Sequence, residues 1–254
     1  MSQKPAYQDD FYNDRHERTL YAARTLLDHV AGIVPPIGSA VDVGCGVGTW
    51  LAVLRERGVE QLRGYDGEWV DEKLVQISGE DFARQDLSRP IAAPQTKYDL
   101  AISLEVAEHL PASAADTFVR SLTGLADFIL FSAAIPNQGG QHHVNEQWLE
   151  YWLERFERED YVGLDVIRPQ IWHDRDVAVW YRQNTMLLAR RERIEDLNLA
   201  APAAQLRPIS TVHPEVFISH IQRYEKTLAK HRSVKGSWKL FRRVLRVTSQ
   251  SSDG

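Results

Sequence analysis

Two glutamates and a histidine are closely spaced in the segment SLEVAEH at 103–109. If a helix begins near Leu104, then Glu105, Glu108 and His109 occupy positions i, i+3 and i+4 and share one helix face. Carboxylates favour Mg²⁺ or Mn²⁺, and an imidazole widens the choice of divalent ion. The segment therefore predicts a metal site with these three side chains as ligands.

A pair of adjacent histidines, His142 and His143, lies in the Gly-rich stretch FSAAIPNQGGQHHVNEQW at 131–148. His143, or else His142, is a candidate fourth ligand. An imidazole titrates close to neutral pH, so His143, His142 or His109 could instead act as a general base. A metal-free site stays open as well, with Glu105 only accepting hydrogen bonds and His109 capping or packing the helix.

A glycine loop, VDVGCGVGTW at 41–50, places Gly44, Gly46 and Gly48 after an apolar run and before a helical pattern. Glycines let a ligand approach the backbone where a Cβ would collide. The spacing is G-x-G-x-G, with Thr49 where the dinucleotide fingerprint has its last glycine. Asp66, at the end of the next predicted strand, suits the paired hydroxyls of a ribose. The pattern predicts a nucleoside-containing cofactor and leaves a nicotinamide dehydrogenase as a rival.

Alternating strands and helices are expected to position these residues. The patterns predict strands at 39–44, 62–66, 82–86, 98–106, 126–136, 163–168 and 177–189, and helices at 10–32, 47–58, 69–75 and 146–156. Alternation of this kind is typical of a doubly wound parallel sheet of the Rossmann-like α/β class. The last two strands have no clear long helix between them, which favours an antiparallel ending.

These motifs resemble those of the class I S-adenosylmethionine-dependent methyltransferases over about residues 38–190. The resemblance implies that Asp42 supports the loop, that the three glycines line the methionine part of the cofactor, and that Asp66 holds the ribose. It also implies that Asp86 contacts the adenine amino group and that Leu87 lies beside the adenine ring. Leu104, at the end of the fourth strand, would face the sulfonium. A seven-stranded sheet with an antiparallel last strand is implied as well.

The Glu-x-x-Glu-His motif followed by a later histidine is similar to two metal-dependent groups, the small-RNA 3′-end 2′-O-methyltransferases and the ubiquinone-biosynthesis O-methyltransferases. That resemblance implies the ligand set Glu105, Glu108, His109 and His143. The chain departs from both groups over most of its length, so their substrates do not transfer.

The stretches PNQGGQHHVNEQWLEYW at 136–152 and VWYRQN at 179–184 resemble bacterial methyltransferases associated with glycan and lipopolysaccharide biosynthesis. The expected function is therefore O-methylation of a sugar or glycan hydroxyl, with help from a divalent ion as one option. The alternatives are a phenolic or catechol acceptor, or a non-catalytic cofactor-fold binding module.

Aromatic side chains are frequent in the same region and could stack on a sugar face, although core packing is the default for most of them. They are Trp148, Tyr151, Trp152, Trp172, Trp180 and Tyr181. Gln183 and Asn184 are unusual polar residues within a predicted strand. They either reach the cleft or lie on an exposed strand face.

The length of 254 residues, with 43% hydrophobic and 26% charged residues, fits a globular chain of one domain with extensions and excludes a disordered or collagen-like chain. We expect an N-terminal helical cap at 1–37, a core at 38–192, an Ala/Pro-rich linker at 193–213 and a helical tail at 214–254. The single cysteine, Cys45, excludes an internal disulfide and a Cys-cluster zinc site. Without a long apolar run or a secretory signal pattern, a cytoplasmic location is expected.

Charge is unevenly distributed along the chain. Nine Lys/Arg and one acid give residues 223–246 a charge of +8, and the last eight residues carry −1. Since the net charge of the chain is −5, residues 1–222 carry −12. An amphipathic basic helix is predicted at 237–247, suited to an anionic membrane surface (here the inner membrane face) or an acidic partner. Packing of this helix on its own domain or on a homodimer mate is the alternative. Nucleic acid is a poor fit because the acidic body repels phosphates.

Overall fold

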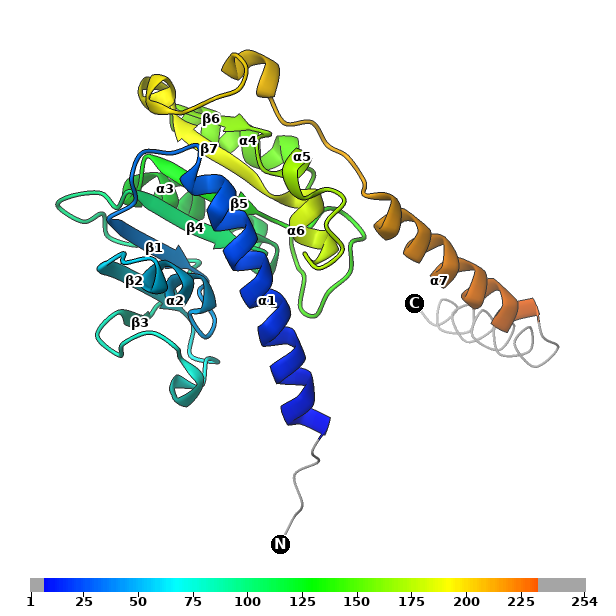
Figure 1. Ribbon diagram of the computed structural model, residues 1–254. Helices are drawn as coiled ribbons and strands as arrows, with labels where there is room; N and C mark the ends of the chain where they lie inside the picture. Colours follow the sequence, from blue (N-terminus) through cyan, green and yellow to red (C-terminus); the bar gives the residue numbers. More distant parts are fainter. Residues whose placement is uncertain (1–6, 233–254) are drawn as a thin grey trace, which may run out of the picture. The chain divides into compact units, whose positions relative to one another are not determined.

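The chain folds around one seven-stranded sheet of order β3-β2-β1-β4-β5-β7-β6 (Figure 1). The computed structural model describes residues 7–232, with side chains for 19–203 and 205–230. The strands are β1 (Ser39–Val43), β2 (Gln61–Asp66), β3 (Phe82–Arg84), β4 (Leu100–Leu104), β5 (Phe128–Ser132), β6 (Tyr161–Leu164) and β7 (Met186–Arg190). Pairing is parallel from β3 to β5, whereas β7 runs antiparallel to both β5 and β6. The predicted fold class, including the antiparallel last strand, is confirmed.

Helices cover both faces of the sheet, and the strands alternate their side chains between the two layers. One layer holds α1 (Tyr7–Ala31), α2 (Thr49–Glu56), α5 (Arg168–Ile171) and α6 (Val179–Asn184); the other holds α3 (Ala115–Leu125) and α4 (Leu149–Arg158). Ala40 and Leu130 face the first layer, and their neighbours Val41 and Ile129 face the second. Burial on both faces explains why these strands read as continuous apolar runs.

Three local predictions are wrong. The strand expected over 177–189 is helix α6 followed by the shorter strand β7. The helix expected at 69–75 is only a 3₁₀ turn, η1 (Glu72–Leu74). The helix expected from Leu104 is also a 3₁₀ turn, η2 (Ala107–His109). At α6 tertiary packing overrides strand propensity, because the helix buries Gln183 and Asn184 among polar partners.

The predicted linker at 193–213 packs on the core along much of its length. It contains the 3₁₀ turns η4 (Arg191–Asp196) and η5 (Ala203–Leu206). The Asp165 N–H donates to the Leu206 carbonyl at 2.6 Å, and the Arg168 guanidinium donates to the Ile209 carbonyl at 3.1 Å. The chain divides into two compact units after Thr211.

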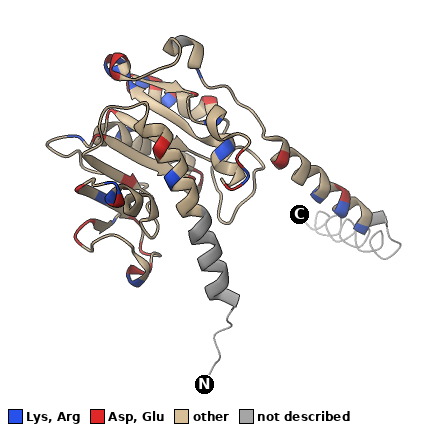
Figure 2. Ribbon diagram, in the orientation of Figure 1, with Lys and Arg blue, Asp and Glu red and all other residues tan. Residues whose placement is uncertain are grey.

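The second unit contains α7 (Pro214–Arg232), which confirms the predicted helix start; the predicted basic helix at 237–247 lies outside the described residues. Charged residues of both signs are mixed over the described part of the first unit, while α7 carries Arg223, Lys226 and Lys230 (Figure 2). Within residues 7–232, no helix has the length and apolar character that crossing a bilayer requires.

Candidate active site at the carboxyl edge of the sheet

The glycine loop follows β1 at the edge where the parallel strands end, the usual ligand position in such sheets. Its first residue is held against β2, since the N–H groups of Gly44 and Cys45 both donate to the Tyr65 carbonyl, at 2.8 and 3.1 Å. A Cβ on Gly44 would lie 2.3 Å from a methyl carbon of Val106. The loop therefore touches the segment that carries Glu105, Glu108 and His109, and only glycine permits that contact.

Two buried carboxylates flank this loop. Asp66, at the end of β2, accepts from the Gly46 and Gly67 N–H groups, each at 2.6 Å. Burial raises the pKa of Asp66, and these two donors partly offset the effect. Asp42 lies on β1 with 2% of its surface exposed. Within the described residues its Oδ2 has no hydrogen-bond partner, and burial together with the charge of Asp66 raises its pKa well above the ordinary value.

The remaining predicted cofactor residues lie at the adjacent strand ends. Asp86 is exposed just after β3, and its carboxylate accepts from the Ser88 N–H and hydroxyl at 3.0 and 2.6 Å. Leu87 is buried in the core, and Leu104 is the last residue of β4. All three follow or end parallel strands on the same edge of the sheet.

Glu105 does not share a helix face with Glu108 and His109. The strand continues to Leu104, and Glu105 then adopts a left-handed backbone conformation with φ +56°. Its carboxylate accepts from Gln138 Nε2 at 2.8 Å and from Asn184 Nδ2 at 3.0 Å. The expected i, i+3, i+4 geometry is wrong because β4 persists to the sheet edge and a tight turn, not an α-helix, follows it.

Glu108, His109 and His143 nevertheless come together. One potential ligand atom from each lies within 4.8 Å of the other two, and the imidazole ring centroids are 4.8 Å apart. Glu105 is not a member of this group. The three residues come from the turn after β4 and from the loop after β5, so the fold brings together segments that are distant in the sequence.

The Glu108 carboxylate is fully buried, and among the residues that the structure describes neither of its oxygens accepts a hydrogen bond. Burial, reinforced by the charge of Glu105, raises its pKa far above the ordinary range; backbone N–H groups nearby counter this only in part. A buried carboxylate without partners is costly unless a cation neutralises it. With two imidazoles beside it, the set fits a divalent ion.

One of the two imidazoles is held through a ring nitrogen, since His143 Nδ1 lies 2.9 Å from Glu146 Oε1. Such outer partners fix the orientation of a ligating histidine and leave the other nitrogen for the metal. Burial, and next the charge of His143, lower the pKa of His109, which favours the neutral form that a ligand needs.

The imidazole of His142, in contrast, is exposed, and it is not part of the donor cluster formed by Glu108, His109 and His143. Of the two candidate histidines, the structure brings only His143 to the cluster. The two histidines differ in burial, which depends on how the loop folds. Because they are identical neighbours, the sequence does not indicate which of them is buried.

Sequence reasoning missed Gln138 and Glu146. Glu146 also accepts from the Asn137 and Gly139 N–H groups at 2.7 and 3.1 Å, so it folds the Gly-rich loop around His143. The spacing of His143 and Glu146, three residues apart, was the available signal. Gln138 had none, because its partner Glu105 is remote in the chain.

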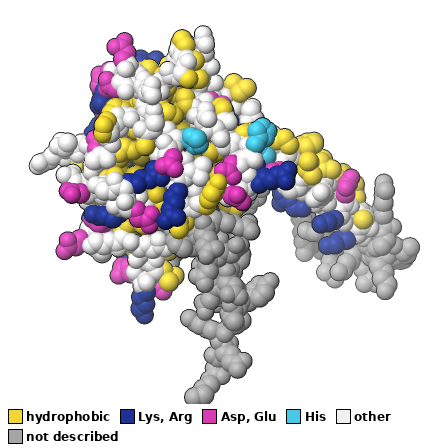
Figure 3. Space-filling view, in the orientation of Figure 1, with side chains coloured by type: hydrophobic (Ala, Val, Ile, Leu, Met, Phe, Trp, Pro, Cys, Tyr) yellow, Lys and Arg dark blue, Asp and Glu magenta, His cyan; other side chains and the backbone are white. Residues whose placement is uncertain are grey.

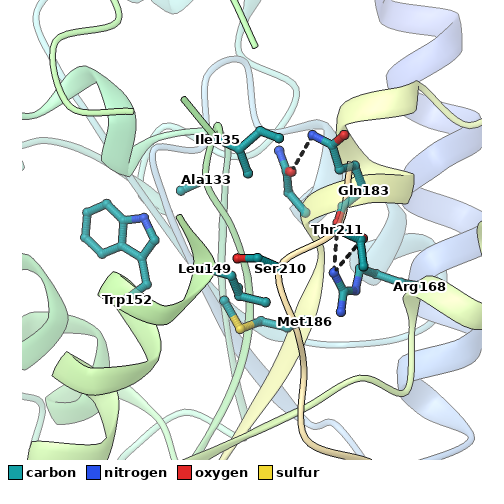
Figure 4. Close-up of a pocket in the computed structure, with 10 residues that line it drawn as sticks. Ala133, Ile135, Leu149, Trp152, Arg168, Gln183, Met186, Ser210 and Thr211 are labelled. Atoms are coloured by element: carbon teal, nitrogen blue, oxygen red, sulfur yellow. Dashed lines mark hydrogen bonds between the residues drawn. The ribbon is translucent and has the colours of Figure 1, made fainter. Parts of the chain in front are cut away.

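A small pocket lies between β5, β7, α4 and the segment at 210–211 (Figure 4). Its lining includes apolar side chains on one side, from Ala133, Leu149, Trp152 and Met186. On the other side lie Arg168 and Gln183. Of the aromatic residues considered for sugar stacking, Trp152 and Tyr181 are buried, whereas Trp148 and Trp180 are 45% and 41% exposed.

Residues 14–162, more than half of the chain, match the model of the family described as "Methyltransferase domain". The chain belongs to this family. It is an S-adenosylmethionine-dependent methyltransferase. No curated protein matches the sequence.

Solved methyltransferases are similar in fold. Magnesium protoporphyrin IX methyltransferase from Synechocystis PCC 6803 is 18% identical, with a TM-score of 0.48 over 75% of this chain and 90% of that one. The plantazolicin methyltransferase BpumL is 15% identical, with a TM-score of 0.48 over 72% and 89%. The methyltransferase domain of bacterial CtHen1-CN is 17% identical, with a TM-score of 0.44 over 68% and 96%.

The residues of this methyltransferase fit its cofactor. The buried, unpartnered Oδ2 of Asp42 suits the ammonium group of the methionine part. A Cβ built on Gly46 would meet no atom within 4 Å, so the space above the loop is open to a ligand. Asp66 and the three clustered donors lie at the same edge of the sheet, since Asp66 ends β2 and Glu108 and His109 lie in the turn after β4.

Proposed function

We propose that this methyltransferase transfers a methyl group to a hydroxyl of a sugar or glycan, with Glu108, His109 and His143 holding a divalent ion beside the acceptor. One observation carries the proposal: the Glu108 carboxylate, without a hydrogen-bond partner among the described residues, converges with the imidazoles of His109 and His143, and Glu146 holds His143 through Nδ1. Two imidazole donors favour a transition ion such as Mn²⁺ over Mg²⁺, which prefers oxygen ligands.

A hydroxyl acceptor explains why the site needs this cluster. The cofactor, when bound, supplies an electrophilic methyl group, and the protein must orient the hydroxyl and assist loss of its proton. A divalent ion, when bound, lowers the pKa of an attached hydroxyl and can fix two neighbouring oxygens, as on a vicinal diol. Glu146 orients the ring of His143 through the contact at Nδ1.

Exposed apolar side chains around the loop and α6 support a sugar acceptor. Val144 is 65% exposed next to His143, and Trp148 and Trp180 remain accessible on the loop and on α6. Aromatic faces of this kind can pack on the C–H face of a sugar ring.

The test is a methyl-transfer assay over nucleotide sugars, oligosaccharides and catechols, with and without EDTA. We expect turnover on a sugar acceptor that EDTA abolishes and Mn²⁺ restores, and a loss of about 100-fold or more in His143→Gln, as for other catalytic acid–base or ligand groups. His142→Asn is the matched control, since Asn tolerates the φ of +61° at that exposed neighbour. Turnover unaffected by EDTA and by Glu108→Gln would refute the metal, and methylation of catechols alone would refute the sugar.

We also propose that the C-terminal unit binds an anionic membrane surface. Apolar side chains recur along α7 at i, i+4, i+7 and i+11 and are exposed by 59%, 42%, 64% and 38%: Phe217, Ile221, Tyr224 and Leu228. In Figure 3 apolar side chains follow one edge of this helix and Lys and Arg follow the other. The charge of +8 over residues 223–246 adds to this attraction for anionic lipid.

A further inference from the structure

The Glu105 carboxylate lies beside the donor cluster but has different partners. Its Oε2 accepts from Gln138 Nε2 at 2.8 Å and its Oε1 from Asn184 Nδ2 at 3.0 Å. Glu108, in contrast, has no such donor within the described chain. Both oxygens of Glu105 are therefore already satisfied by amide donors, while Glu108 is the carboxylate that lacks a counterpart.

The amide side chains also bond to one another. Gln138 Oε1 accepts from Asn184 Nδ2 at 2.8 Å and from Gln183 Nε2 at 3.1 Å, and Gln183 Nε2 lies 3.0 Å from Asn184 Oδ1. Gln183 and Asn184 are almost completely buried. The network thus joins three elements that meet only in the folded chain: the end of β4, the loop between β5 and α4, and helix α6.

We propose that Glu105 is a positioning residue, which holds the 133–148 loop and its His143 in place through Gln138, and is not a ligand of the cation. The proposal deepens the function given above and rests on it for the role of His143. It assigns the two glutamates of the Glu-x-x-Glu-His motif to different tasks, Glu108 to the ion and Glu105 to the loop.

Contacts lead from Glu105 to His143 through the turn at 138–140. Gln138 precedes Gly139 and Gly140, and a Cβ on Gly140 would lie 2.1 Å from His143 Nε2. The imidazole therefore rests directly on the turn that Gln138 anchors. The C-terminal part of the loop has its own anchor, because the Val144 and Asn145 N–H groups donate to the Glu108 carbonyl at 2.9 and 3.0 Å. That second anchor is backbone, so changing the Glu108 side chain leaves it in place.

The network also forms one polar wall of the small pocket, since Gln183 and Asn184 line it together with Ile135 (Figure 4). Loss of Glu105 should therefore disturb the network and the placement of His143 without removing a donor from the cluster. Loss of Glu108 should remove a donor and leave the loop in place.

Two measurements on the full chain distinguish these roles: Mn²⁺ affinity by electron paramagnetic resonance, and hydrogen exchange of peptides within 133–148. In Glu105→Gln we expect exchange of the loop to accelerate about tenfold, as when a charge-assisted hydrogen bond is weakened, with Mn²⁺ affinity kept within about threefold. In Glu108→Gln we expect Mn²⁺ affinity to fall about tenfold or more and loop exchange to stay within about twofold of wild type. Gln138→Met removes the donor at the other end and should reproduce the exchange of Glu105→Gln.

The proposal is overturned if Glu105→Gln weakens Mn²⁺ binding as much as Glu108→Gln does, or if loop exchange is unchanged in both Glu105→Gln and Gln138→Met. Should Glu105→Gln fail to fold, Gln138→Met alone decides by the same exchange criterion. If the wild-type protein binds no Mn²⁺, the metal in the proposed function fails, and loop exchange still decides the role of Glu105.

Discussion

The open space above Gly46 allows a test of cofactor binding in which backbone strain is held constant. Gly46 has φ +55°, and a Cβ built on it would meet no atom within 4 Å. Gly58, just past the C-terminus of α2, has φ +86° and is equally open. Gly46→Ala and Gly58→Ala therefore introduce the same methyl group into the same backbone region without a steric clash. Only Gly46 lies in the loop that we assign to the cofactor.

The expected magnitudes follow from this geometry. A left-handed backbone costs an L residue about 1–2 kcal/mol, so both variants should lose that much stability. For a chain of this size the melting temperature should fall by about 2–8 °C in each variant. Gly46→Ala should also bind S-adenosylhomocysteine about tenfold or more weakly, or about 1.4 kcal/mol, because its methyl group occupies the space of the ligand. In Gly58→Ala the affinity should stay within about twofold, or roughly 0.4 kcal/mol.

Isothermal titration with S-adenosylhomocysteine and thermal unfolding provide the two readouts. A Gly46→Ala protein that is destabilised like Gly58→Ala but keeps full affinity would show that the ligand does not approach this glycine. Unchanged stability in both variants would instead show that the strain at positive φ has been overestimated. Gly44→Ala should be worse than either, since its Cβ would also collide with Val106.

Three further predictions concern the rest of the molecule. The folded-state pKa of Asp42 is raised above its ordinary value of 3.8, so wild-type stability falls as pH rises from there toward the folded-state pKa. Asp42→Asn lacks this loss and should gain stability relative to wild type as pH rises in urea melts; a pH-independent difference would contradict this reasoning. The Tyr161 hydroxyl donates to the Ala126 carbonyl at 2.6 Å, and Tyr161→Phe should lose about 1–2 kcal/mol with S-adenosylhomocysteine affinity unchanged. A stability equal to wild type would show that the bond contributes nothing. The full-length protein should float with phosphatidylglycerol vesicles and not with neutral ones, and deletion of 212–254 should abolish flotation; equal flotation after deletion would refute the membrane surface.

The positions of the glycine loop and of Asp66 could be predicted because their signal is local. A strand, a turn and a helix in succession place Gly44, Gly46 and Asp66 at one sheet edge wherever the sheet forms. The Glu-x-x-Glu-His motif was also visible, but its geometry was not. Helical spacing assumed an α-helix at Leu104, whereas hydrogen bonding to neighbouring strands extends β4 and leaves only a 3₁₀ turn after it.

By itself the sequence determined the α/β class, the succession of the seven strands, the position of the glycine loop and the identity of the histidines and carboxylates. These follow from short-range patterns of hydrophobicity and glycine. Tertiary structure decided which of them meet. It buried Glu108 without a partner, chose His143 over His142, and satisfied Glu105 with amides from Gln138 and Asn184. Burial and hydrogen-bond satisfaction depend on segments remote in the chain, so identical residue types in one motif acquire different chemistry only when the chain has folded.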